Sequence, residues 1–91
     1  MDVREFTIRG KVQGVGFRHF TVNAAAQWDI RGEVKNMPDG SVHCIAMGEP
    51  QNMAGFIKAL HQGPSWGRVD SVDETQLDAA AHSFSAFRVT Y

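Results

Sequence analysis

Apolar and polar side chains alternate along residues 3–12, with glutamate, threonine, arginine and lysine between the apolar positions. A period of two residues is typical of a strand that buries one face. Beyond Gly16 the spacing changes, because apolar residues recur at helical intervals as far as Trp28 and include three consecutive alanines. We therefore predict a strand over residues 3–12 and a helix that begins near Arg18.

Two further strand-like runs lie close together, at residues 30–37 and 41–47. The residues between them, Pro38-Asp39-Gly40, have the preset and permissive backbone angles that tight turns require. This pattern predicts a β-hairpin.

A second helical pattern follows the hairpin. Its apolar residues share one helical face because they fall at positions i, i+3, i+4 and i+7: Met53, Phe56, Ile57 and Leu60. Gly63-Pro64 marks the end of this helix, since glycine favours a helix terminus and proline cannot continue one.

In the remainder of the chain, the residue pattern predicts a fourth strand at Val69–Glu74 and a last strand at Phe84–Tyr91. The residues between these two strands show no clear hydrophobic periodicity. The last strand carries three large side chains on one side: Phe87, Val89 and Tyr91. Up to the fourth strand the order is β, α, β, β, α, β. This order predicts an α+β, ferredoxin-like βαββαβ sandwich, in which an antiparallel sheet carries two helices on one face.

Composition narrows the class of protein. A length of 91 residues allows one modest core, so we expect a single domain over residues 1–91. The formal net charge of -1 leaves no positive surplus for a nucleic-acid backbone. Cys44 is the only cysteine, which excludes an intramolecular disulfide and a cysteine-rich metal site. Because the sequence shows no leader and no membrane-spanning apolar run, we expect a cytoplasmic protein without a membrane partner. We also expect a monomer that does not bind nucleic acid.

The loop after the first predicted strand is the most informative segment. Gly14 and Gly16 can adopt positive φ without a Cβ penalty, so that successive N–H groups turn toward one point as an anion-binding nest. The following helix adds unpaired first-turn N–H groups and the positive end of its dipole. Arg18 offers two parallel donors to two phosphate oxygens. The loop lacks the features of a Walker A or dinucleotide motif. On the glycines alone, an ordinary strand-to-helix turn with a solvent-facing arginine remains the alternative.

Two motifs carry a family resemblance. The stretch from Gly10 to Arg18, GKVQGVGFR, resembles the signature of the acylphosphatase family. A second segment follows that family's other signature in spacing: it runs from Gly32 to Asn36, continues at Gly40-Ser41-Val42 and ends at Gly48. The likeness extends to the last residues of the chain, and two long motifs in the correct order make it specific.

The resemblance implies an enzyme that hydrolyses acyl phosphates to a carboxylate and inorganic phosphate. Arg18 and Asn36 are then the catalytic residues, and Asn36 orients the attacking water. The implied phosphate-binding residues are Gln13, Gly14, Val15, Gly16, Phe17 and Arg18. The expulsion of a carboxylate, whose reference pKa is about 4, needs no general acid, and we expect neither a metal nor a cofactor.

Alternatives from other classes remain. One is a non-catalytic domain or one that handles carbamoyl phosphate for a partner, as in hydrogenase maturation. Another is a binding module on the same scaffold, although the aromatic and basic surface that RNA would need is missing. The family pattern is broken at Glu33, where an aromatic residue is usual, and at Trp66, where smaller residues are common. Cys44 and Phe56 are expected in the core, and the histidines in structural or surface positions.

Overall fold

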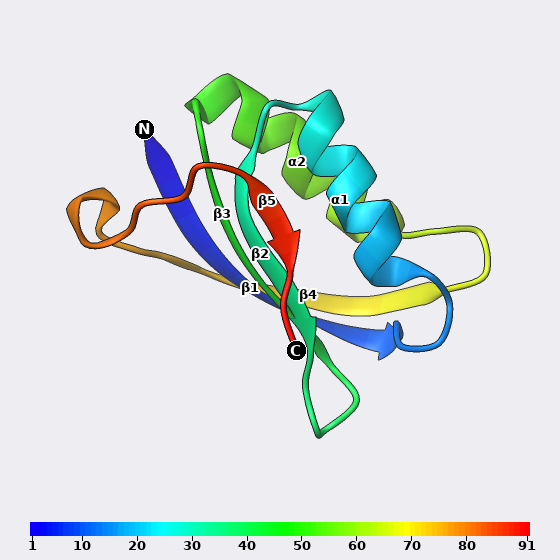
Figure 1. The fold of residues 1–91 in the computed structure, drawn as a ribbon. Helices are drawn as coiled ribbons and strands as arrows, with labels where there is room; N and C mark the ends of the chain where they lie inside the picture. Colours follow the sequence, from blue (N-terminus) through cyan, green and yellow to red (C-terminus); the bar gives the residue numbers. More distant parts are fainter.

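The computed structural model describes all residues from 1 to 91 and has a β-sheet with two helices and one 3-10 turn. The elements run in the order β1 (Asp2–Lys11), α1 (Phe17–Gln27), β2 (Arg31–Asn36), β3 (Val42–Gly48), α2 (Pro50–Gln62), β4 (Arg68–Gln76), the 3-10 turn (Ala79–Ala81) and β5 (Phe87–Val89). Figure 1 shows both helices on one face of the sheet. The predicted ferredoxin-like fold is confirmed.

The five strands lie in the order β4-β1-β3-β2-β5. Three of the strand pairs are antiparallel as expected, but β5 pairs with β2 in parallel. The reason is the path of the chain, which leaves β4 at one edge of the sheet and returns at the opposite edge, where β5 runs in the direction of β2 (Figure 1). The last strand is shorter than the predicted Phe84–Tyr91, because only Phe87–Val89 form a regular ladder.

The core fills the space between the sheet and the helices. Fourteen buried residues form one cluster, in which Phe56 of α2 packs edge-on against Phe6 of β1. Phe56 also packs edge-on against Phe87 of β5, which is partly buried at the border of the cluster. The predicted core position of Cys44 is confirmed, because its side chain is fully buried. Burial raises the pKa of the Cys44 thiol, so this group stays neutral and inert.

The two helices approach each other closely at Gly55 of α2. A Cβ atom at this position would lie 2.6 Å from three atoms of the Trp28 indole, which follows α1. Glycine is therefore required here by space, although it costs the helix about 1 kcal/mol relative to alanine. The contact with Trp28 explains why glycine occupies position 55, where helix propensity alone would disfavour it.

The other face of the sheet carries polar side chains. Glu33 projects to this side, opposite to its buried neighbour Val34, and its carboxylate accepts a hydrogen bond from the Thr90 hydroxyl at 3.3 Å. Trp66 lies in the loop between α2 and β4 and is 82% exposed. Neither helix has the length and apolar character that crossing a membrane would require.

Candidate active site

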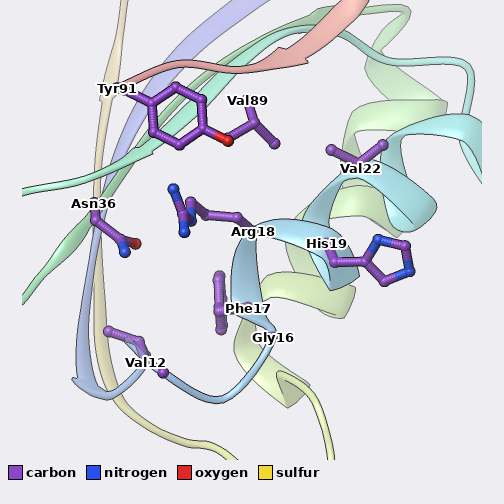
Figure 2. A pocket seen from close by; sticks show the side chains of 10 residues that line it. Val12, Gly16, Phe17, Arg18, His19, Val22, Asn36, Val89 and Tyr91 are labelled. Carbon is purple, nitrogen blue, oxygen red and sulfur yellow. The ribbon is translucent and has the colours of Figure 1, made fainter.

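A cavity of about 410 Å³ opens beside the first turn of α1. Its walls come from the loop after β1, from α1, from the end of β2 and from β5 with the residues that follow it (Figure 2). Ten residues line it: Val12, Gly14, Gly16, Phe17, Arg18, His19, Val22, Asn36, Val89 and Tyr91. The fold thus brings both predicted catalytic residues, Arg18 and Asn36, to one cavity.

The loop between β1 and α1 has the predicted left-handed conformation at both glycines. The φ angles are +73° at Gly14 and +78° at Gly16, and a Cβ at either position would meet no atom within 4 Å. The backbone angle, and not lack of space, therefore requires glycine at both positions. Alternation of left-handed and ordinary residues is the arrangement that turns neighbouring N–H groups toward a shared anion.

The N-terminus of α1 has no side chain that caps it. Gly16 occupies the capping position, no side chain bonds to the first turn, and no acidic residue stands there. None of the backbone N–H groups from residue 14 to 18 donates to another group of the protein. These donors, together with the positive end of the helix dipole, form a site suited to an anion.

The guanidinium of Arg18 lies between two groups of the cavity wall. Its Cζ atom is 5.3 Å from the centre of the Tyr91 ring, a cation–π distance, and Figure 2 shows the Asn36 amide on its other side. Arg18 forms none of the ion pairs of the structure. Its N–H donors are therefore available to a ligand.

Asn36 ends β2 two residues after the buried Val34, so the alternation of the strand places both side chains on the same face of the sheet. Its Oδ1 atom is buried and has no hydrogen-bond partner in the protein. An unsatisfied buried acceptor costs about 1–3 kcal/mol, and such groups are rare in native structures. The structure has two such atoms, and while Asp2 Oδ1 lies outside the cavity, Asn36 Oδ1 lies on its wall, where a bound molecule can supply the missing donor.

Two of the predicted phosphate-binding residues, Gln13 and Val15, do not line the cavity with their side chains. The Gln13 side chain instead turns to the hairpin, where its Nε2 donates to the carbonyl oxygens of Met37 at 2.8 Å and Ser41 at 2.9 Å. An anion in the cavity could therefore be bound by these two residues only through their backbone N–H groups.

Sequence reasoning missed five wall residues: Val12, His19, Val22, Val89 and Tyr91. For two of them a signal was present, since Phe87, Val89 and Tyr91 share one side of the last predicted strand and Phe87 packs in the core. Nowhere does the structure assemble three His, Cys, Asp or Glu side chains that could hold a metal ion.

Comparison with known proteins gives a consistent result. The acylphosphatase family model matches residues 4–89. An acylphosphatase of Salinibacter ruber is 46% identical over 82 residues, which cover 90% of this chain and 85% of that protein. The crystal structure of the Bacillus subtilis acylphosphatase superimposes over 100% of both chains with a TM-score of 0.95 at 30% identity. The crystal structure of T. kodakarensis HypF matches 100% of this chain with a TM-score of 0.86 at 26% identity, but only 12% of that longer chain. The chain therefore belongs to the acylphosphatase family, whose enzymes hydrolyse acyl phosphates.

Proposed function

We propose that the protein hydrolyses acyl phosphates in this cavity, with the phosphoryl group on the loop of residues 13–17 and on Arg18, and with Asn36 orienting the attacking water. The observation that carries the proposal is the convergence of unpaired groups on one cavity. Free N–H donors, a free guanidinium and the unsatisfied Asn36 Oδ1 all meet there.

The phosphoryl end of the substrate needs a compact set of donors. A loose transition state spreads negative charge over the phosphoryl oxygens, and catalysis consists mainly of positioning and of stabilising that charge. The nest of N–H groups provides fixed dipoles for this purpose, and the planar fork of Arg18 adds two parallel charged donors.

The reaction itself needs little proton transfer from the protein. The water oxygen bonds to phosphorus while the bond from phosphorus to the acyl oxygen breaks, and the carboxylate leaves with the electron pair. Because a carboxylate has a pKa of about 4, it leaves without protonation. Asn36 accepts a hydrogen bond from the water at Oδ1, and the water's proton passes to a phosphoryl oxygen.

The acyl end of the substrate extends along the apolar side of the same cavity. Figure 2 shows Val22, Val89 and the Tyr91 ring on this side, away from Val12 and the loop. These side chains offer contact area but no charged partner to a leaving group.

The test is an assay of benzoyl phosphate hydrolysis with the variants Arg18→Ala and Arg18→Lys. We expect Arg18→Ala to lose nearly all turnover and phosphate binding, and Arg18→Lys to recover little, because an ammonium lacks the bidentate fork. Arg31→Ala is the matched control, since Arg31 is exposed at the start of β2 and lies outside the cavity. Turnover by Arg18→Ala at the level of the wild type would contradict the proposal.

The same assay with carbamoyl phosphate addresses the alternative named in the sequence analysis, a carbamoyl-phosphate-handling or non-catalytic domain. Tight binding of carbamoyl phosphate without release of inorganic phosphate from either substrate would favour that alternative.

A further inference from the structure

The Gln13 side chain joins two segments that no other hydrogen bond connects. It stands at the start of the phosphate loop and donates from one nitrogen to the carbonyl oxygens of Met37 and Ser41, at 2.8 and 2.9 Å. Apart from these two bonds, no hydrogen bond links residues 12–18 to residues 36–41.

Sheet topology explains why such a link matters. The phosphate loop follows β1 and Asn36 ends β2, but β3 lies between these two strands. No ladder of backbone hydrogen bonds joins β1 directly to β2; each pairs with β3, where Val42 lies opposite both Ile8 and Asn36, and the phosphate loop begins beyond the last of these pairs. The Gln13 amide joins the phosphate loop directly to the hairpin that follows β2.

The hairpin that receives the Gln13 amide is itself well fixed. Met37 donates its N–H to the Ser41 carbonyl at 2.8 Å, and the Asp39 carboxylate accepts from the Ser41 N–H at 2.9 Å and from its hydroxyl at 2.6 Å. These Ser41 donors also hold the pKa of the Asp39 carboxyl below its ordinary value. Gln13 thus attaches the loop to a rigid turn.

Met37 directly follows Asn36, and the Asn36 amide has no hydrogen bond of its own to the protein. Its position over the cavity is consequently set by the backbone of β2 and by whatever holds that backbone against the loop. Misplacement by about 1 Å can cost a catalytic group roughly 10²-fold in rate. The two hydrogen bonds of Gln13 next to Asn36 therefore affect the geometry in which the water attacks phosphorus.

We propose that Gln13 is a positioning residue, which fixes the phosphate loop against the hairpin and so aligns the water held by Asn36 with the phosphorus atom. This inference rests on the proposed function. It assigns the Gln13 side chain a role separate from that of its backbone N–H, which belongs to the phosphate site.

The test is a double-mutant cycle with Gln13→Met, which keeps the length of the side chain but removes both donors, and Asn36→Ala. We expect Gln13→Met to lower kcat for benzoyl phosphate about 10- to 100-fold. The inhibition constant of inorganic phosphate should change less than about threefold, because Arg18 and the N–H groups remain. In the Asn36→Ala background the Gln13 substitution should leave kcat unchanged, since it acts through Asn36.

Gln27→Met is the control, because Gln27 is exposed at the end of α1 and forms no side-chain hydrogen bond. Gln13→Glu provides a second variant of native shape that lacks the donors, and thermal melting establishes that each variant is folded at the assay temperature. An unchanged kcat in both folded Gln13 variants, or a loss that adds fully to that of Asn36→Ala, would overturn the inference. If Arg18→Ala and Asn36→Ala retain full turnover, the proposed function fails first, and the inference fails with it.

Discussion

The amide oxygen of Asn36 is the one unpartnered buried side-chain atom in the cavity wall. The protein buries the Oδ1 atom of Asn36 without a partner, whereas the buried Thr21 hydroxyl donates to the Phe17 carbonyl at 2.8 Å. The free-energy cost of an unsatisfied buried acceptor is tolerated where that group binds a ligand and does not stabilise the fold. Asn36 is therefore expected to contribute to catalysis without contributing to stability.

The variant Asn36→Ala separates these two quantities. We expect kcat for benzoyl phosphate to fall by about 10² or more, as for the loss of one fixed group that acts in the transition state. The free energy of unfolding should stay within about 0.5 kcal/mol of the wild type or rise slightly, because the variant loses no protein hydrogen bond. Urea denaturation measures the second quantity, and Asn52→Ala on α2 is the control. Loss of stability with retained kcat would instead mark Asn36 as a turn residue.

At the residue scale the sequence predicts only part of this site. Gly14, Gly16 and Arg18 are recognisable because positive φ and bidentate charge demand particular residue types. The bonds of Gln13 to two carbonyl oxygens have no such signature, since any chain segment offers carbonyl acceptors. Which hairpin lies beside the loop is decided by the tertiary fold, so the orientation of this side chain is visible only in the structure.

Among the elements, the packing of α1 against α2 illustrates a conflict between local preference and tertiary contact. Alanine at Gly55 would favour the helix, but the Trp28 indole occupies the space of its side chain. The ring atoms are rigid and approach within 2.6 Å of the Cβ position, so that helix or ring must shift. Overpacking of this kind costs about 1–3 kcal/mol, which exceeds the gain of about 1 kcal/mol from helix propensity.

Gly55→Ala is accordingly expected to lower the free energy of unfolding by about 1 kcal/mol. In a Trp28→Ala background the same substitution should become stabilising by up to about 1 kcal/mol, because the obstructing ring is gone. Chemical denaturation of the four proteins gives both values. Ala54→Gly, at an exposed neighbouring position, reports the effect of propensity alone. Equal effects in the two backgrounds would show that Trp28 does not control the choice of glycine.

Element boundaries were predicted well where the period was strong and less well at the end of the chain. Both helices and the first four strands lie close to their expected ranges. In the final segment the alternation of Phe87, Val89 and Tyr91 was correct, but it could not reveal that the ladder with β2 includes only three residues or that it runs parallel. Strand direction depends on the crossing of the chain from β4, which leaves no local pattern.

For the whole molecule, the binding of an anion must be local, because the formal net charge is -1. A ligand that binds only the folded state stabilises it in proportion to its concentration above Kd. Inorganic phosphate is a product of the proposed reaction. Its effect on the stability of the protein therefore measures anion binding in the cavity without any catalytic turnover.

We expect phosphate at ten times its Kd to stabilise the wild type by about 1.4 kcal/mol, which corresponds to a rise of roughly 6–11 °C in Tm for a domain of this size. Scanning fluorimetry measures the shift, with sodium chloride of equal ionic strength as the control. Arg18→Ala should show little shift at the same phosphate concentration, whereas Arg31→Ala should respond as the wild type does. An equal shift in Arg18→Ala would place the phosphate elsewhere.

The backbone nest also has a consequence for the evolution of the loop. Its donors belong to the main chain, so a nucleotide change that replaces Val15 alters none of the groups that would hold the anion. Any such change that replaces Gly14 or Gly16 adds a Cβ atom at positive φ and strains the loop. Anion binding therefore restricts the two glycines but not the identity of the side chain between them, which is limited only by its packing against the core.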